Sequence, residues 1–582
     1  MEKRTIIAII LMFIVMVLWG VIESKFFPKP PPQIPKQEEK KEQPAAVEKG
    51  IEKGAGLKEA KPQKAGSGPA TIKMVEKKEV SVETNNFWAI LTNEDGRVKH
   101  FRLKKYEDRA KQAPMTIKLL ELVHGIIGGK VEEPPNPKPM DLVNTEEGEG
   151  LPLGVTFSDS NLAESEGYWE VDKESLKLLN SGEKGDITFV KAFEGGVKVY
   201  KRYEFSAEEE AVNLQVEIQN ESSKEVTTQI GLEWIGRVEL KKLAAEGNKD
   251  FGLKYVFFKN HKAEVKDLAG AGGSGCTPGC QSAKTSVEPF EFSDKGDIGW
   301  YAFEGEYFAA MLFPPPSEKN VILAVKGNEK NLVRAAIMTS AVSIPSQQSA
   351  KMPFKVYMGP RSEDQLKKLG SSAEKIIDFG YFTIVAKPIL WFLNLTHKAT
   401  NNYGLDIILV SILMKLIFLP LTQISFKSMK NMQKIQPEMN RLRETYKDDK
   451  ARLQQEIMLL YKRRKVNPMS GCLPMVIQIP VFIALYNALQ NAIEMRHAPF
   501  FLWITDLAAK DPLYISPIVM GASMVIQQKM TPTAGDPAQA KLMLLMPVMF
   551  TFLFLSFPSG LVIYWMVNNV LSIAHQYYLS KS

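Results

Sequence analysis

A lysine stands in the middle of a long apolar stretch of this sequence. Lys415 lies within Ile408–Gln423, whose residues on either side are apolar enough to enter a bilayer. An ammonium group in mid-span costs roughly 2.5–3.5 kcal/mol on insertion scales. Its plausible chemistry at that depth is electrostatic, because a buried cation attracts or balances negative charge. Ser411, one helical turn earlier, adds a hydroxyl group to the same region.

The composition of the neighbouring apolar runs limits the functions that this cation can have. A proton or ion pathway requires intramembrane Asp, Glu or His partners, and the other runs carry almost none. They carry uncharged polar side chains instead, which are Gln478, Asn487, Gln490, Gln527, Gln528, Asn568, Asn569 and Ser572. About 12 residues, or roughly 18 Å of helix, separate Lys415 from Lys427, too far for snorkelling. We therefore expect Lys415 to face a water-filled cavity open to the cytoplasm, although Gln and Asn also join transmembrane helices.

Six segments are predicted to cross a membrane. Thr5–Ile22 is uncharged and follows Lys3 and Arg4, which favours an uncleaved anchor with a cytoplasmic N-terminus. A cleaved signal peptide is the alternative, but its apolar region is usually shorter and ends in small residues. The five further spans are Tyr403–Ile424, Cys472–Ala492, Leu513–Met530, Leu542–Phe557 and Leu561–Leu579.

The charge of one loop sets the orientation of these spans. Residues 426–467 carry twelve Lys and Arg against five acidic residues, a bias typical of a short cytoplasmic loop. Counting spans from it places both termini inside and the long region between the first two spans outside. This loop accounts for the net charge of +7, so we infer no sequence-specific binding of nucleic acid.

The same loop is predicted to form a helical hairpin with a basic exterior. Apolar residues recur at helical spacing on both sides of Lys447–Lys450, at Met432, Ile435, Met439 and Leu442 and again at Leu453, Ile457 and Leu460. Its outer face is expected to include Lys430, Lys434, Arg441, Arg443, Lys462, Arg463 and Arg464. The hairpin is either a stable loop or a landing surface for an anionic partner such as a ribosome or lipid headgroups.

The region before these spans has the composition of a tether followed by a β domain. Residues 28–70 are rich in Pro, Lys, Glu and Gly and are expected to be extended. Residues 71–360 contain many short alternating runs, such as the hairpin Phe87–Leu103 with its Asp-Gly turn, which predict a large β-sandwich. No nucleophile–base pair, phosphate loop or metal cluster stands out in it. Cys276 and Cys280 sit in a Gly-rich loop and are expected to close a small disulfide loop if this region lies outside the cytoplasm.

Between the β domain and the spans, Glu363–Asp378 has the period of an amphipathic helix. Such a helix can lie in the membrane interface, or it can pack on the β domain. The pattern leaves both open. With it, the expected organisation is an anchor (1–27), a tether (28–70), a β-sandwich (71–360), an interfacial helix and connection (361–400) and a five-span core (401–582) with its hairpin at 427–467.

Several segments of the core resemble those of the YidC membrane protein insertases of bacteria. They are Phe418–Thr422, Val466–Pro474, Ile477–Pro480, Ala498–Leu507, Asp511–Pro512, Gln528–Met530 and Phe557–Leu561. Together and in this order they are highly specific. The anchor, tether and β domain fit the layout of the Gram-negative members.

The resemblance implies a non-enzymatic insertase of the inner membrane that works without a cofactor. Its clients are nascent membrane proteins, and its partners are the Sec translocon, the ribosome and the lipid bilayer. A cation in the first core span would attract the client's polar segment, and Lys415 replaces the usual arginine there. Lysine keeps the charge and loses the forked donors of arginine. Tyr564 and Trp565 match an aromatic pair along which clients slide, which is usually two tyrosines.

The fold class expected from these observations is a multi-domain membrane protein. It combines an N-terminal anchor, a periplasmic β-sandwich and a five-helix bundle with a cytoplasmic hairpin. The expected groove residues are Ser411, Lys415, Gln478, Gln528, Tyr564, Trp565 and Asn568. Two alternatives stay open: a transporter or channel with Lys415 as a counter-charge for its substrate, and a tethered carbohydrate enzyme in the β domain.

Overall fold

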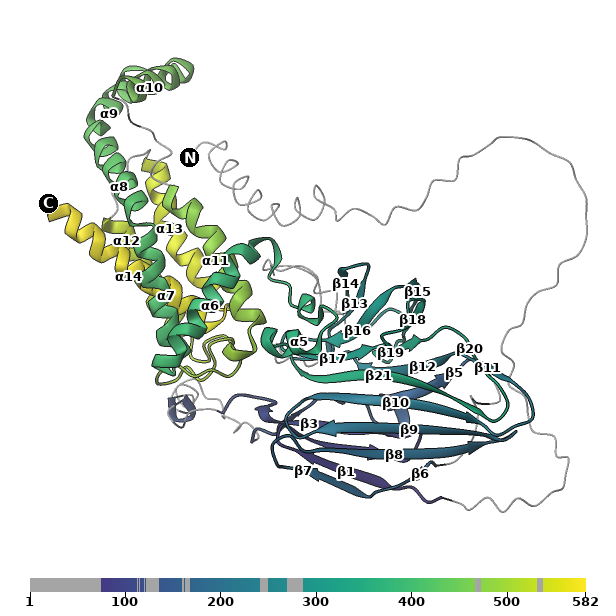
Figure 1. Ribbon diagram of the computed structural model, residues 1–582. Helices are drawn as coiled ribbons and strands as arrows, with labels where there is room; N and C mark the ends of the chain where they lie inside the picture. The colour runs from purple at the N-terminus through teal and green to yellow at the C-terminus, as the bar shows by residue number, and fades with distance from the viewer. Residues whose placement is uncertain are drawn as a thin grey trace, which may run out of the picture. The chain divides into compact units, whose positions relative to one another are not determined.

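The computed structural model describes residues 75–111, 114, 116–119, 121, 136–159, 162, 168–240, 250–268, 286–464, 466, 473–530 and 537–581. The expected anchor, the tether and the three cysteines lie outside these residues. Strands predominate in the described part up to Pro360, which also contains the 3₁₀ helix η1 (Glu147–Glu149), and helices predominate from Glu363 onward (Figure 1).

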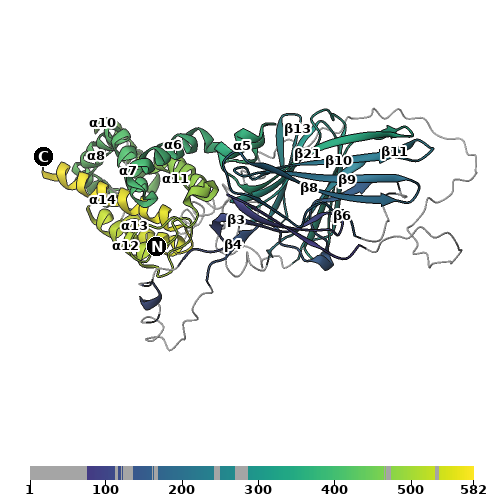
Figure 2. The same cartoon turned by 60° about the horizontal axis from the view of Figure 1, so that its bottom comes forward.

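The strands form mainly antiparallel sheets. The largest has nine strands in the order β14 (Lys262–Asp267), β13 (Lys254–Lys259), β16 (Ile298–Glu304), β17 (Phe308–Phe313), β21 (Gln348–Pro360), β10 (Ala211–Asn220), β9 (Val197–Ser206), β8 (Lys184–Phe193) and β6 (Glu170–Val171). Its ten-residue strands β8, β9 and β10 lie side by side in both views (Figures 1 and 2). A two-stranded sheet pairs β11 (Val226–Thr228) with β20 (Val342–Ile344).

Two five-stranded sheets complete the β domain. One has the order β4 (Pro139–Asp141), β3 (Arg97–Glu107), β2 (Phe87–Thr92), β1 (Glu79–Thr84) and β7 (Ser175–Leu178). The other has the order β15 (Phe290–Gly296), β18 (Val321–Gly327), β19 (Leu332–Met338), β12 (Ile230–Arg237) and β5 (Gly154–Phe157).

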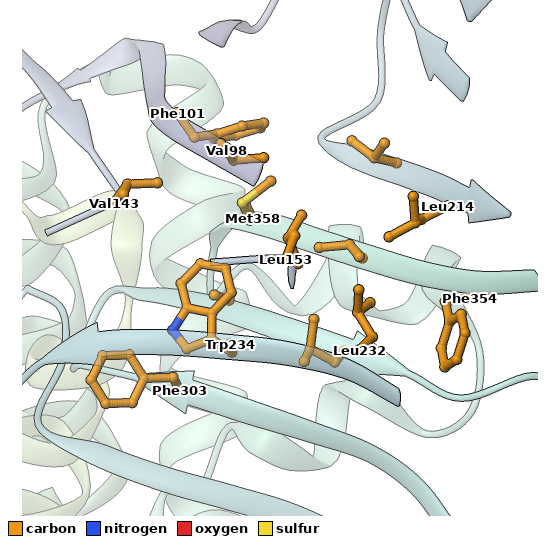
Figure 3. Close-up of a cluster of buried hydrophobic side chains, with 14 of the residues drawn as sticks. Val98, Phe101, Val143, Leu153, Leu214, Leu232, Trp234, Phe303, Phe354 and Met358 are labelled. Atoms are coloured by element: carbon orange, nitrogen blue, oxygen red, sulfur yellow. The ribbon is translucent and has the colours of Figure 1, made fainter. Parts of the chain in front are cut away.

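One hydrophobic core joins the three large sheets, which confirms the expected sandwich. Figure 3 shows Phe101 of β3, Trp234 of β12 and Phe303 of β16 in one cluster with side chains of β10 and β21. Each of these three aromatic side chains is at most 1% exposed. The core therefore needs all three sheets, because each contributes one apolar face.

The nine-stranded sheet is buried on both faces at β13, β16 and β17. Alternate side chains point to opposite faces of a strand: Phe303 faces the sandwich core, whereas Trp300 and Ala302 face a second cluster. That second cluster is covered by α5 (Glu363–Leu369) and the 3₁₀ helix η2 (Ala373–Ile376). Double burial explains why these strands are almost continuously apolar in sequence.

The amphipathic segment after the β domain therefore packs on the sheet. Its apolar residues Leu366, Ala373 and Ile376 are at most 2% exposed against β13, β16 and β17. Gly370 ends α5 with a φ of 78°, so the expected single helix is two short ones. Of the two positions that the sequence allowed, the structure has the one on the β domain.

A buried lysine fastens the predicted β2–β3 hairpin to the nine-stranded sheet. The hairpin turn has positive φ at Asp95 and Gly96, as an Asp-Gly turn should. Lys201 of β9 is 0% exposed, and its Nζ donates to the carbonyls of Asp95 (2.9 Å) and Leu153. The Tyr203 hydroxyl donates to the Gly96 carbonyl at 2.6 Å. Burial lowers the pKa of Lys201 from 10.5 to about 7.

We predict that Lys201 makes the β domain more stable at alkaline pH. Between pH 7 and 10 the unfolded chain holds a proton on this lysine that the folded chain has released. The free energy of unfolding then rises with pH, by up to about 1.4 kcal/mol per pH unit, and the contribution is constant below pH 7. Unfolding in urea, followed by tryptophan fluorescence at several pH values, should show this rise of the free energy of unfolding with pH. The substitution Lys201→Met should remove the rise. An equal slope in both proteins contradicts the prediction.

The second part is a helical bundle. Its helices are α6 (Thr383–Thr400), α7 (Tyr403–Ile417), α11 (Leu473–Asn491), α12 (Ile515–Met530), α13 (Pro537–Phe554) and α14 (Ser559–Lys581), with 3₁₀ turns η3 (Gly380–Phe382) and η5 (Ile493–Met495). Helix α14 packs against α7, α11 and α12, and α6 packs against α7 and α11 (Figure 1).

The expected span Tyr403–Ile424 is broken. Helix α7 ends at Ile417, and α8 (Leu419–Lys434) continues after a bend of 60°. Pro420 explains the break, because proline has no N–H for the helical ladder and restricts the residue before it. Among the described residues no single helix is both long and apolar enough to cross a membrane, whereas this bent pair meets the criterion as a unit.

The predicted helical hairpin is present beyond α8. Helix α9 (Gln436–Thr445) and α10 (Lys450–Arg464) enclose a small core of Met432, Ile435, Met439, Leu460 and Val466. An ion pair between Arg464 and Glu438 joins the two helices. The hairpin thus has its own apolar seam.

Candidate functional site

Lys415 lies in the last turn of α7. The side chain of Asn402 caps the start of this helix by accepting from the N–H groups of Gly404 (2.9 Å) and Leu405 (3.2 Å). The break at Pro420 ends the helix two residues after Lys415. The carbonyl groups of a last helical turn carry partial negative charge. The fold therefore places the ammonium group where it gains stabilisation without a carboxylate.

The partner of Lys415 is a neutral hydroxyl group. Its Nζ donates to Oγ of Ser572 in α14 at 2.7 Å, and Ser572 in turn donates to the carbonyl of Asn568 at 2.7 Å. Lys415 is half-buried, and no carboxylate of a described residue forms an ion pair with it. Two large cavities lie elsewhere in the described residues, and neither is lined by Lys415 or by α14.

Tyr564 and its neighbours form a second polar group in the bundle. Tyr564 lies near Gln478 of α11 and near Asn568, whose Nδ2 donates to the Tyr564 carbonyl at 2.9 Å. The side chain, which was expected to border the path of a client, is only 1% exposed. It packs in the apolar cluster that α11 and α14 share.

Two other expected groove residues, Trp565 of α14 and Ser411 of α7, make separate contacts. Trp565 is half-buried among Phe482, Phe550 and Phe554, with ring centroids 5.2 to 6.0 Å away. Ser411 is buried and donates to the carbonyl of Ile407 in its own helix at 2.7 Å. The structure thus joins Lys415 to α14 through Ser572, whereas Ser411 and Trp565 make other contacts.

Gln528 carries an open hydrogen-bonding group. Its Nε2 is buried, and no described residue accepts a hydrogen bond from it. Because a buried donor without an acceptor is costly, this amide is available to a water molecule or to a bound chain.

The basic face of the hairpin is exposed as expected. Arg443 is half-buried, and six of the seven basic residues singled out are exposed, which are Lys430, Lys434, Arg441, Lys462, Arg463 and Arg464. Of these, Arg464 has an acidic partner, Glu438 of α9.

Two titratable groups in the bundle escaped the sequence reasoning. Asp406 is 0% exposed near the start of α7, and its carboxylate accepts from Thr400 Oγ1 (2.8 Å) and lies 3.0 Å from Nδ1 of His397 in α6. The ring of Tyr403 stacks on His397 with centroids 3.6 Å apart. The second group, His575, follows Ser572 by one turn of α14. Asp406 and His575 both lie in mostly apolar runs, so the average hydropathy of each run does not reveal a single titratable residue.

Asp406 and Lys415 point in different directions from α7. Nine residues separate them, which at about 100° per residue places them on opposite sides of the helix. The Asp406 side is fastened to α6, so the Lys415 side is turned toward α14. The buried carboxylate therefore fixes the rotation of the helix that carries the cation.

We predict that His397→Ala destabilises the bundle more than Asp406→Asn does. His397→Ala leaves the buried carboxylate of Asp406 with one hydrogen-bond donor fewer, which lowers the free energy of unfolding by about 1–3 kcal/mol. In Asp406→Asn the amide oxygen still accepts the hydrogen bond from Thr400. Thermal unfolding midpoints of the detergent-solubilised chain measure both. Lys398→Ala, an exposed change on α6, is the matched control. Equal midpoints for His397→Ala and the control would show that the pair contributes nothing.

Comparison with known proteins accounts for the whole chain. Residues 130–392 match the family described as "YidC periplasmic domain", and residues 395–582 match the family described as "60Kd inner membrane protein". The membrane protein insertase YidC of Syntrophus aciditrophicus is 37% identical over 100% of this chain and 100% of its own length. The chain belongs to the YidC family. It is an inner-membrane insertase with a periplasmic β domain and membrane-protein clients, as the sequence predicted.

Other YidC proteins agree with this assignment. The YidC insertase of Geotalea daltonii is 37% identical over 100% of this chain and 99% of its own. A solved structure, the active YidC insertase with its first transmembrane domain resolved, is 19% identical, covers 87% of this chain and 93% of its own, and has a TM-score of 0.37. The assignment rests on the full-length relatives and the two family matches. An insertase function replaces the transporter and carbohydrate-enzyme alternatives.

Proposed function

We propose that the polar seam between α7 and α14, centred on Lys415 and Ser572, receives the hydrophilic segment of a client. The observation that carries this proposal is the half-buried ammonium group whose partner is a neutral hydroxyl. A cation already satisfied by a carboxylate would gain little from a client. Lys415 instead has charge left for an incoming acidic or polar group, which can replace Ser572.

In this mechanism the insertase lowers a barrier and makes no covalent change. Lys415 and the amide groups of Gln528 and Asn568 hold water and client polar groups, so that the apolar layer to be crossed is thinner. The client's hydrophobic segment leaves into lipid beside Trp565, and its burial releases about 25 cal/mol per Å² of apolar surface. Tyr564 supports the groove by joining α11 to α14.

The charge of residue 415 is expected to decide whether cells depleted of their own insertase are rescued. Lys415→Arg should rescue growth, Lys415→Ala should rescue it partly, and Lys415→Glu should fail, because an anion repels acidic clients. Lys398→Glu makes the same charge change at an exposed position on α6 and should rescue fully. Full rescue by Lys415→Glu, with equal protein levels, would discard the charge mechanism.

We further propose that both chain termini are cytoplasmic and that the hairpin of α9 and α10 meets the ribosome during synthesis of a client. The support is its row of exposed basic residues on a hairpin with its own core, because such a surface attracts polyanions. Clients delivered by the Sec translocon would reach the same groove from the membrane side.

Reversing charges at the end of α8, which leads into the hairpin, and on α10 should weaken binding to ribosomes. In a variant with Lys430, Lys434, Lys462 and Arg463 all changed to Glu, co-sedimentation with ribosomes should fall by about tenfold or more and lose its dependence on salt. Arg464 is left in place because it joins α9 to α10. Exchanging Lys and Arg at the same positions is the control. Undiminished co-sedimentation of the charge-reversed variant would exclude the hairpin as the contact.

A further inference from the structure

Helix α14 presents a row of polar side chains along one face. Tyr564, Asn568, Ser572 and His575 are spaced by four, four and three residues, which places them above one another. The first three are linked, since Asn568 donates to the Tyr564 carbonyl and Ser572 donates to the Asn568 carbonyl. Lys415 joins the row at Ser572. His575 is the next group along this face.

The imidazole of His575 has an open position. The residue is half-buried, and its Nε2 is buried without a hydrogen-bond partner among the described residues. A buried polar atom of this kind costs free energy unless something supplies a partner. No described residue of the bundle does so, which leaves this position open to water or to a bound chain.

Among the described residues, the charged group that acts on His575 is positive. The charge of Lys415 in α7 acts on its ring. Of the other helices packed against α14, α11 contains no charged residue, and the one charged residue of α12 is Lys529 in its last turn. The single acidic residue of α7, Asp406, is on the far side of that helix and is paired with His397.

His575 also lies on the entry side of Lys415. Helix α14 runs toward its end at Lys581, and α7 runs toward its end at Ile417, from which α8 leads into the basic hairpin. His575 is one turn beyond Ser572 in the direction of Lys581. On the proposed orientation a polar segment that arrives from the cytoplasm meets His575 before it meets Lys415.

We propose that His575 is a second recognition residue of the groove, which together with Lys415 selects clients whose hydrophilic segment is acidic. This inference rests on the proposed function of Lys415. Neutral His575 offers the groove one hydrogen bond, and protonated His575 offers a second positive charge. A histidine at this place makes the preference for acidic clients depend on cytoplasmic pH.

The test uses the full chain reconstituted in lipid vesicles and two matched single-span clients. One carries Asp and Glu in its translocated segment, and the other carries Asn and Gln at the same places. Insertion is measured by protease protection between about pH 8 and about pH 6, where client carboxylates stay ionised. Burial and the charge of Lys415 disfavour the protonated imidazole, whereas the carboxylates of an acidic client beside it favour that form. The acidic client should therefore insert about two- to fivefold better at the lower pH, because one more positive charge then faces it. The neutral client should show no change.

Variants of His575 separate its contribution from that of Lys415. His575→Gln should insert the acidic client at a pH-independent level close to that of the parent at pH 8. His575→Arg should give a pH-independent level close to that of the parent at pH 6. In Lys415→Arg the charge of residue 415 is positive at every pH used, so the insertion of the acidic client should still depend on pH.

An unchanged slope in His575→Gln would overturn the inference, as would a pH-dependent His575→Arg or an equal slope with the neutral client. The proposed role of Lys415 is judged separately, by the loss of insertion in Lys415→Glu at every pH. The experiment can therefore contradict the role of His575 without contradicting that of Lys415, and the reverse.

Discussion

The structure of the bundle depends on a cation that is stabilised without an anion. Lys415 has the carbonyl end of α7 and the hydroxyl of Ser572 as its surroundings, and each supplies partial negative charge only. Under the proposed mechanism a carboxylate partner would be a disadvantage, because a client would have to displace it. The helix ends two residues after Lys415, just before Pro420. The neutral partner leaves the charge of Lys415 uncompensated among the described residues.

Two buried titratable groups fix parts of the structure away from that cation. Asp406 fastens the opposite side of α7 to α6, and Lys201 fastens a hairpin of the β domain to its largest sheet. The acidic group is held by side chains that donate hydrogen bonds, and the basic one by backbone carbonyls. Both are inaccessible to a client. The fold thus separates the buried titratable groups that fix structure from the half-buried ammonium group of Lys415.

Much of this architecture could be read from the sequence, and the exceptions have physical causes. Alternation predicted the sandwich, and the Asp-Gly turn predicted the β2–β3 hairpin, because both depend on local rules. The period of Glu363–Asp378 showed an apolar face and could not show which surface covers it. The rotation of α7 escaped prediction, since a helix of mean apolar character conceals where single residues such as Asp406 and His575 point. The burial of Tyr564 depends on a partner in another helix, which no spacing encodes.

The bend after α7 has one more consequence. Phe418 is at once the residue that ends α7 and the residue that begins α8, so no flexible spacer separates the two helices. A change in the angle between α7 and α8 therefore falls on the torsion angles of Phe418 and of the residues on either side of it. Lys415 stands in the last turn before this joint, so the direction of the carbonyl dipoles in that turn depends on the angle at which α8 leaves.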